Sequence, residues 1–217
     1  MAFNFNLNFN PKKEERLGYL LAFFVTCLMA SNFIGMKVAL IYGISISVAI
    51  ITYPFSFVII DAVTAVYGKK TAQHFVNAGL AMLVIAGIFT IISLAAPAAP
   101  RFAYEAEYQT LFAISLRMLV AGLIAYYVAH TLGIHVFKKA FDYFRRKKLW
   151  IAANASNIAG EFVDTMIFMY LAFLGVPGFP PDFIFAIAVP WWIFKSIFNA
   201  LSTPFVYWAT QWLKGGE

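Results

Sequence analysis

Six stretches of mostly apolar residues, each long enough to cross a lipid bilayer, constrain the fold of this chain more than any motif. A membrane-spanning helix needs about 20 such residues, and a chain of 217 residues is too short for six of them and a folded soluble domain. Hydrophobic residues make up 62% of the chain and charged residues only 12%, so no separate soluble domain is expected. The expected spans are residues 17–41, 47–67, 71–96, 109–133, 150–175 and 183–213.

The sequence therefore predicts an all-α polytopic membrane protein, a six-transmembrane-helix bundle over residues 17–213. Residues 1–16 are expected to form a cytoplasmic N-terminal tail, and residues 214–217 a C-terminal tail. The last apolar stretch is long for one helix, and Pro190 and Pro204 offer places for it to bend or break. Residues 43–54 carry no charge and are expected to form either a tight extracellular return or a re-entrant piece.

Lysine and arginine gather in alternate connections between the expected spans. The N-terminal tail, the connections near residues 69 and 145, and Lys214 carry almost all of them, whereas the opposite side carries only Arg101. The positive-inside rule then places both termini in the cytoplasm. The formal net charge of +6 is spread over short connections, so contact with lipid headgroups is expected and nucleic-acid binding is not.

Ionisable residues of both signs lie inside the apolar stretches, and their charges balance. A charge near the bilayer centre costs at least about 3 kcal/mol, so such residues usually face a cavity, pair with each other or bind a substrate. One shared polar site is expected, and ion pairs that only fix the helix packing are the alternative. Lys37 also has the alternative of reaching the interface with its long side chain. The six residues are Asp61, Glu161 and Asp164 against Lys37, Arg117 and Lys195.

The fifth expected span carries a polar stripe. Asn154, Asn157, Glu161 and Asp164 follow one another at steps of three, four and three residues, which places them on one face of a helix. Two acids and two amides on one face of a membrane helix are expected to point into the bundle. The expected partners on other spans are Arg117, Lys195 and Asn199.

Aromatic residues complete the candidate site, whereas signs of catalysis are missing. Trp191 and Trp192 are placed either to stack on a flat ligand or to anchor the outer interface. The three histidines are expected at or near the cytoplasmic ends, without the spacing of a metal-ligand set. No glycine-rich phosphate loop occurs. Neither a metal, nor a cofactor, nor an enzymatic activity is therefore expected.

Motifs in five of the six expected spans, over about residues 17 to 212, resemble the queuosine precursor transporter family, also called the vitamin uptake transporter family. The motifs are Asn32 to Lys37, Tyr53-Pro54 to Asp61, Tyr67-Gly68-Lys69-Lys70, Arg117, His135-Val136-Phe137, Ser156, Gly160, Asp164-Thr165, Ile167-Phe168, Lys195, Thr203-Pro204 and Tyr207.

The resemblance implies an inner-membrane importer of the cyano and aminomethyl 7-deazaguanines, the precursors of a modified tRNA nucleoside. A carboxylate suits such a base, because it accepts the N1 hydrogen and the exocyclic amine together. Asp164 or Glu161 is expected in that role, with Asn157 or Asn199 at the base carbonyl or the pyrrole edge. Asp61 is expected at the aminomethyl cation. The remaining candidate substrate-binding residues are Arg117 and Lys195, which pair with the acids of the empty site, and Asn32 and Trp191.

Two other readings stay open at this point. The first is a substrate-binding subunit of an energy-coupling-factor vitamin importer, which needs separate ATPase and coupling subunits that dock on small residues such as Ala22, Ala30 and Gly35. The second is a passive pore, against which the paired acids and bases argue. The coupling ion and the assembly of the chain into a homodimer also stay open.

Overall fold

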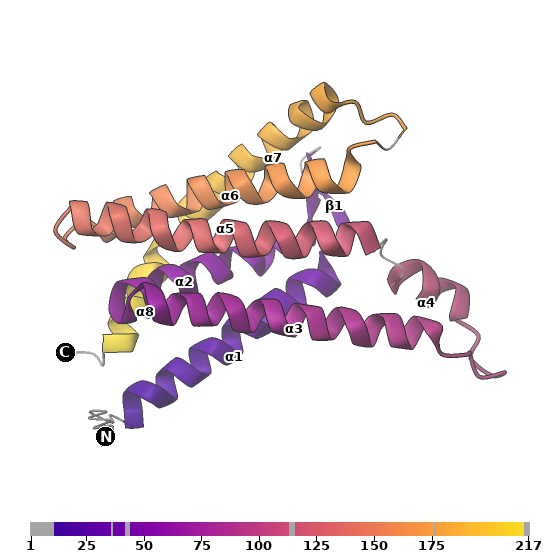
Figure 1. The fold of residues 1–217 in the computed structure, drawn as a ribbon, viewed down its shortest axis with the longest axis horizontal. Helices are drawn as coiled ribbons and strands as arrows, with labels where there is room; N and C mark the ends of the chain where they lie inside the picture. The colour runs from indigo at the N-terminus through magenta and orange to yellow at the C-terminus, as the bar shows by residue number, and fades with distance from the viewer. Residues whose placement is uncertain (1–10, 36, 42–43, 113–115, 176, 215–217) are drawn as a thin grey trace, which may run out of the picture.

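The protein forms a bundle of long helices (Figure 1). The computed structural model describes residues 11–35, 37–41, 44–112, 116–175 and 177–214, so residues 1–10 of the predicted tail over residues 1–16 lie outside the described part. The elements are α1 (Pro11–Ile34), β1 (Val38–Ile41), β2 (Ile44–Ser47), the 3-10 helix η1 (Val48–Ile51), α2 (Tyr53–Tyr67), α3 (Lys69–Ala95), α4 (Glu105–Phe112), α5 (Leu116–Tyr143), α6 (Leu149–Phe173), α7 (Pro181–Leu201) and α8 (Thr203–Lys214).

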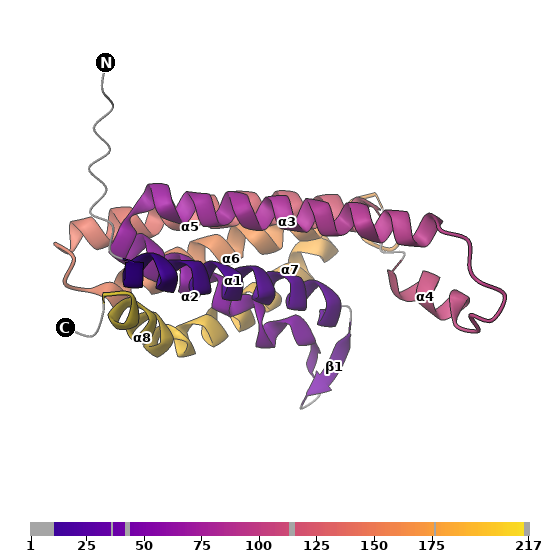
Figure 2. The ribbon, with the colours of Figure 1, turned by 90° about the horizontal axis from the view of Figure 1, so that it is seen from below.

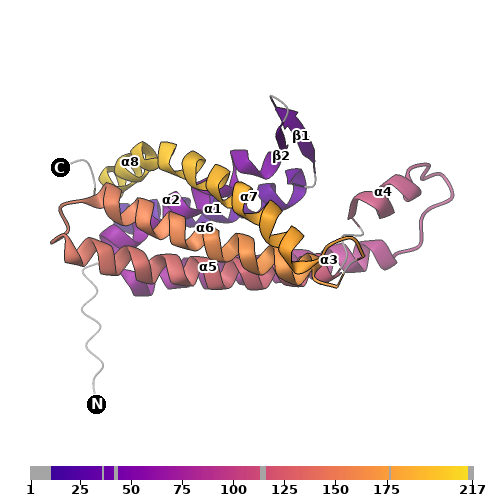
Figure 3. The same cartoon turned by 90° about the horizontal axis from the view of Figure 1, so that it is seen from above.

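The helices lie in layers. Viewed from below and from above, α3 and α5 lie on one side of the bundle, α7 and α8 lie on the opposite side, and α2 and α6 run between them (Figure 2, Figure 3). Helix α6 packs along α5 on one side and against α7 on the other. This arrangement turns the polar stripe of α6 toward neighbouring helices, while its other face stays exposed.

Five segments are long and apolar enough to cross a membrane: Glu14–Ile34, Val48–Tyr67, Lys69–Ala95, Leu119–Tyr143 and Pro181–Leu201. Helix α6 has 25 residues and a comparable length, but the same criteria do not select it among the described helices. Its polar and acidic residues explain this, because Asn154, Asn157, Glu161 and Asp164 lower its mean hydropathy. The protein is thus an all-α membrane protein with one small hairpin.

Several predicted helix ends were wrong. The first span was expected to reach residue 41, but α1 ends at Ile34 and an antiparallel hairpin follows, with Val38 paired to Ser47. Within the expected return, the described residues form β2, η1 and the start of α2. The fourth span was expected from residue 109. Instead, a separate helix α4 ends at Phe112, and α5 begins at Leu116 and continues to Tyr143.

The last apolar stretch is divided into two helices. Helix α7 continues through Pro190 and ends at Leu201. The Ser202 hydroxyl donates to the carbonyl oxygen of Asn199 at 2.9 Å, and α8 begins at Thr203, directly before Pro204. Proline has no N–H to offer a preceding carbonyl, so the break falls at the second of the two predicted sites.

A glycine makes the sharp turn between α2 and α3. Gly68 has a φ of +83°, a conformation that strains residues with a side chain. It lets α3 begin at Lys69, directly after α2 ends at Tyr67. Two consecutive spans therefore meet with almost no connecting loop.

Two apolar clusters hold the helices together. The first joins α1, α2, α3, α5 and α8 through residues such as Phe24, Leu28, Val63 and Val76. The second consists of Val58, Phe137, Leu149, Ala152, Ala153 and Val206, with Ala65 packed against it. Both clusters place α2 at the centre of the fold.

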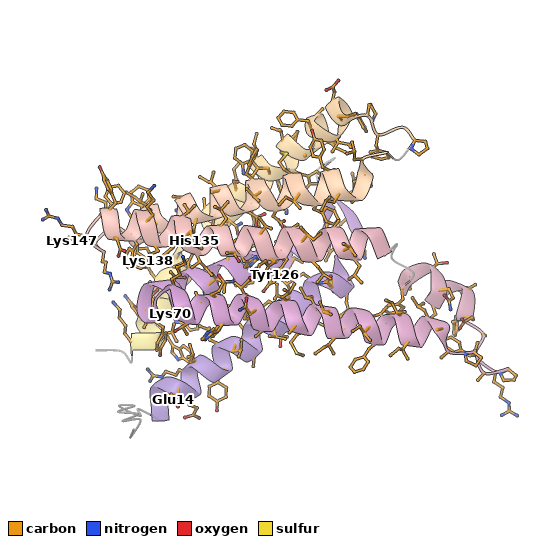
Figure 4. All side chains as sticks on the ribbon, viewed as in Figure 1. Glu14, Lys70, Tyr126, His135, Lys138 and Lys147 are labelled. Atoms are coloured by element: carbon orange, nitrogen blue, oxygen red, sulfur yellow. The ribbon has the colours of Figure 1, made fainter. Side chains whose placement is uncertain are left out.

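Most basic connections lie at one end of the bundle, which we call the basic end. Lys70, Lys138 and Lys147 lie there (Figure 4). The start of α1 and the end of α8 lie at this end too, where Arg16 Nη1 donates to Trp212 O at 2.8 Å. The links from α1 to α2, from α3 to α5 and from α6 to α7 lie at the opposite end (Figure 1). The helices thus alternate in direction.

Candidate functional site

A single lysine joins the two acids of the α6 stripe. Lys195 Nζ lies 3.0 Å from Asp164 Oδ2 and 3.2 Å from Glu161 Oε2. Glu161 is 1% exposed and Asp164 is 8% exposed, so both carboxylates are removed from the surrounding medium. A buried charge needs a partner of opposite sign, and here two carboxylates share one ammonium group.

Neutral side chains occupy the other oxygens of these carboxylates. The Tyr53 hydroxyl donates to Asp164 Oδ1 at 3.0 Å, and Asn199 Nδ2 donates to Glu161 Oε1 at 2.8 Å. Lys195 Nζ also lies 3.5 Å from Thr165 Oγ1 and 5.5 Å from the centre of the Tyr53 ring. We refer to Tyr53, Glu161, Asp164, Thr165, Lys195 and Asn199 as the polar cluster.

Helical periodicity explains how three helices build the polar cluster. Glu161 and Asp164 are three residues apart on α6, and Lys195 and Asn199 are four residues apart on α7, so each pair lies on one helix face. The chain reverses between α6 and α7, which brings the two faces together. Tyr53 is the first residue of α2, and its hydroxyl group reaches Asp164 from this third helix.

The predicted polar stripe on α6 continues beyond the cluster. Asn154 Nδ2 donates to Thr203 Oγ1 of α8 at 3.1 Å. Asn157 is 2% exposed, and its Oδ1 has no hydrogen-bond partner among the described residues. The expectation that the stripe points into the bundle holds for Asn157, Glu161 and Asp164, which are buried, whereas Asn154 is half-buried. The amide oxygen of Asn157 is left with an open acceptor one turn from Glu161.

The polar cluster suits a ligand that donates hydrogen bonds. Two carboxylates and one ammonium group leave one unit of negative charge if both acids are ionised. Asn199 Oδ1, which is buried, also has no hydrogen-bond partner within the described part of the chain. Carboxylate and amide oxygens accept hydrogen bonds but do not donate them. The arrangement therefore favours a partner that is rich in N–H groups.

Asp61 was expected in the same site, but its contacts lie elsewhere. Its Oδ1 accepts a hydrogen bond from Ser156 Oγ at 2.8 Å, on a different face of α6 from Glu161. None of its hydrogen bonds or ion pairs involves the polar cluster, as far as the described residues go. The structure thus contains two separate buried acidic sites, on two faces of one helix.

Four other candidates are not brought to the polar cluster by any described contact. Asn32 is exposed and donates to Leu28 O of its own helix at 2.9 Å. Lys37 lies just past α1 and is exposed. Trp191 contacts Phe194 one turn away on α7, whereas the neighbouring Trp192 donates to Ile158 O of α6 at 3.0 Å. Arg117 lies at the start of α5, but its side chain is outside the described part of the structure.

Sequence reasoning missed two interior residues, Tyr53 and His130. His130 was expected near the cytoplasmic end of its span, and this was wrong, because α5 continues thirteen residues further, to Tyr143. Its ring is completely buried, lies 3.1 Å from Ser56 Oγ and stacks on Phe57 at 4.3 Å. The sequence did place Tyr126 and His130 four residues apart, on one helix face. The span predicted for that helix ended at residue 133, ten residues before the end of α5.

Two surface hollows are apolar, and none of their lining residues belongs to the polar cluster. Tyr19, Leu20, Phe23, Trp208 and Trp212 line a hollow of about 160 Å³ between α1 and α8. The other, of about 240 Å³, lies between α3 and α5. Among the described residues, no group of three histidine, cysteine or acidic side chains is placed to hold a metal ion.

Two bacterial transporters resemble this chain in sequence. The chain is 24% identical over 191 residues to the "Probable queuosine precursor transporter" of Bacillus subtilis (strain 168), which covers 87% of this chain and 82% of that protein. It is also 24% identical over 200 residues to the "Queuosine precursor transporter" of Escherichia coli (strain K12). That match covers 89% of this chain and 86% of that protein. No solved structure matches the chain.

The family model described as "Putative vitamin uptake transporter" matches residues 47–209. This match includes all of α2, α3, α5, α6 and α7, and therefore every helix that contributes to the polar cluster. The resemblance found in the sequence motifs is confirmed, and the chain belongs to the vitamin uptake transporter family.

Proposed function

We propose that this chain imports queuosine precursors, 7-cyano-7-deazaguanine, 7-aminomethyl-7-deazaguanine or both, across the inner membrane of a bacterium. The names of the two relatives support the substrate class. The observation that carries the proposal is Lys195, which holds Glu161 and Asp164 together inside a helical bundle. A salt bridge that is shared in this way can release one carboxylate while the other stays paired.

The released carboxylate is the group that recognises the base. A deazaguanine presents its N1 hydrogen and an exocyclic amine side by side, and one carboxylate accepts both in a bidentate, charge-assisted pair. Asp164 or Glu161 takes this role. The open amide oxygens of Asn157 and Asn199 accept N–H groups at another edge of the base, and their amide nitrogens donate to its carbonyl group.

Substrate binding then exchanges one set of partners for another. In the arrangement described, Lys195 and Tyr53 occupy Asp164. When a base takes their place, the contacts between α2, α6 and α7 change. A ligand shifts a conformational equilibrium only through such a difference in contacts between the states.

The basic end faces the cytoplasm in this proposal. Helices α1, α2, α3, α5 and α6 each cross the membrane, and α7 with α8 makes the sixth crossing. Both termini are then cytoplasmic, which agrees with the positive charge of the basic end. The polar residues of α6 are tolerated within the membrane because they face neighbouring helices.

The test is binding and uptake by the purified chain. We expect both deazaguanines, but not adenine or a water-soluble vitamin, to stabilise the protein against thermal unfolding, and the protein alone in liposomes to take them up. Asp164→Asn, and separately Lys195→Ala, are expected to reduce uptake tenfold or more, since a hydrogen bond to a charged group contributes about 1.5–3 kcal/mol. Membrane abundance is expected to stay near normal.

Asp182→Asn is the matched control, because Asp182 is exposed at the start of α7. The same chemical change at this position is expected to leave uptake unaltered. If Asp164→Asn and Lys195→Ala instead lose abundance while the remaining protein transports normally, the ion pair is structural and the proposal fails. Both relatives are named as transporters, so we expect uptake without ATPase or coupling subunits. A requirement for such subunits would point to an energy-coupling-factor importer.

A further inference from the structure

The Asp61 carboxyl group is buried with a single polar partner. Asp61 is 1% exposed, and Ser156, which donates to its Oδ1 at 2.8 Å, is completely buried. Its Oδ2 has no hydrogen-bond partner among the described residues. Val58, one turn before Asp61 on α2, and Ala65, one turn after it, both pack in the second apolar cluster. Among the described residues, the Ser156 hydroxyl group is thus the one hydrogen-bond partner of this buried carboxyl group, and apolar residues flank it along α2.

Several ionisable groups on the helices around α2 are engaged with partners other than Asp61. No described lysine, arginine or histidine side chain forms an ion pair with Asp61. The engaged groups are Arg16 of α1 with Trp212 O, Lys69 of α3 with His135 of α5, His130 of α5 with Ser56 and Tyr126 O, Glu161 and Asp164 of α6 with Lys195, and Tyr207 of α8 with the Trp150 N–H.

The excess of buried carboxyl groups over buried ammonium groups indicates that one carboxyl group holds a proton. Within the described interior, three carboxyl groups, Asp61, Glu161 and Asp164, face one ammonium group, that of Lys195. An unpaired ionised carboxylate in apolar surroundings is strongly unfavourable and takes up a proton instead. Metal cations of the oxygen-binding kind need six or more oxygen ligands, whereas Asp61 has one hydroxyl neighbour. A proton needs no further ligands.

We propose that Asp61 binds the proton that drives import, and that the structure shows the protonated state. The inference rests on the proposed function and adds its coupling ion. One proton enters from the outer medium with each base, is held as the neutral Asp61 carboxyl group, and leaves to water at the basic end. Asp61 lies about two helical turns from Lys69 and Lys70, whose positive charge favours the ionised carboxylate and hence release of the proton.

Ser156 connects the proton to the substrate site. It lies on α6, the helix that also carries Glu161 and Asp164, so α6 is held to α2 through Asp61 and to α7 through Lys195. Loss of the proton leaves a bare charge in the apolar contact between α2 and α6, which then opens to admit water. Such a contact with two discrete arrangements links proton release to the access of the base.

The experiment uses proteoliposomes with a pH-sensitive dye inside and the uncharged 7-cyano-7-deazaguanine outside, so that any lumen acidification reports protons that move with the base. Wild-type protein is expected to acidify the lumen during uptake and to accumulate the base when the outside is acidic. Asp61→Asn is expected to bind the base within threefold of wild type and to exchange it across the membrane, while acidification and pH-driven accumulation fall at least tenfold. Asp142→Asn, an exposed acid near the end of α5, is the matched control and is expected to behave like wild type.

Each outcome separates the inference from the proposed function. Wild-type uptake of the base without lumen acidification would overturn the inference and leave the function intact, whereas no uptake of either deazaguanine would reject the function itself. Acidification that persists in Asp61→Asn but is lost in His130→Gln would move the proton site to His130. If Asp61→Asn does not fold, Asp61→Glu carries the test. It keeps a carboxyl group at a new position, and a pH dependence of accumulation unchanged from wild type would also overturn the inference.

Discussion

Tyr53 is the residue that completes the polar cluster without adding charge. Its hydroxyl donates to Asp164 Oδ1, while Lys195 occupies Oδ2. A hydrogen bond to a charged group stabilises a protein by about 1.5–3 kcal/mol. We therefore expect Tyr53→Phe to lower the midpoint of thermal unfolding of the ligand-free protein and to weaken deazaguanine binding about tenfold, as measured by calorimetry.

The control for this substitution is Tyr127→Phe. Tyr127 is 38% exposed and lines the apolar hollow between α3 and α5, so removing its hydroxyl group is expected to change neither stability nor binding. Equal behaviour of the two variants would show that the Tyr53 hydroxyl group contributes nothing to the site.

Among single residues, the sequence predicts charged partners better than neutral ones. The pairing of Lys195 with Glu161 and Asp164 follows from helical spacing and from the cost of burying charge. Tyr53 carries no such cost, and a tyrosine in an apolar stretch is usually an interface residue, so its role stayed hidden. The predicted balance of charges also fails at Lys37, which lies exposed beyond the end of α1.

Close approach between α3 and its neighbours depends on Gly79. A Cβ atom there would lie against the Tyr126 hydroxyl group and only 2.8 Å from Leu28 Cδ1, and all three residues are buried. Overfilling a well-packed site costs about 1–3 kcal/mol. Gly79→Ala is therefore expected to lower the midpoint of thermal unfolding in detergent, with the loss of the hydrogen bond from Tyr126 to Val76 O.

Gly18→Ala tests whether this effect is specific to the position. Gly18 is exposed on α1, and a Cβ atom there meets nothing within 4 Å. Alanine favours a helix over glycine by up to about 1 kcal/mol, so this variant is expected to be as stable as wild type or slightly more stable. A Gly79→Ala protein that unfolds no earlier than Gly18→Ala would contradict the close approach.

For whole elements, apolar length predicts which segments are helical but not where they end. The hairpin after Ile34 lies in a stretch at least as apolar as α1, so hydropathy does not reveal where that helix ends. Helix α4 begins with the acidic residues Glu105 and Glu107, but its last residues, from residue 109 on, were assigned to the fourth expected span. The break before α8 was foreseen, because proline has a defined backbone consequence. The effect of a proline on the backbone around it can be predicted from the sequence. The pairing of two strands in a hairpin cannot, because it depends on contacts between separate segments of the chain.

The alternation of the helices makes the orientation of the molecule testable. Lys147 lies at the basic end (Figure 4), and Arg101 lies in the link between α3 and α4. In a Cys27→Ala background, a membrane-impermeant maleimide added to intact cells is expected to label Arg101→Cys but not Lys147→Cys, and to label both after lysis. Labelling of Lys147→Cys in intact cells would reverse the proposed orientation.

The bundle as a whole follows from the sequence more closely than its site does. Apolar stretches and alternating charges predict the class of fold and the grouping of the basic links, because both are set by the lipid surroundings. The separation of Asp61 from Glu161 and Asp164 is different, since it depends on how α2 is rotated against α6. Side-chain spacing along one helix carries no information on that rotation.

The polar face of α6 also bears on how the protein is made. A segment that leaves the ribosome with two acids and two amides on one side partitions poorly into lipid by itself. Helix α6 packs along most of the length of α5, which precedes it in the chain. Its integration therefore depends on α5 being retained beside the translocation channel until the pair enters the bilayer as a hairpin. The helix that carries the substrate site is thus the one whose insertion relies most on a neighbour.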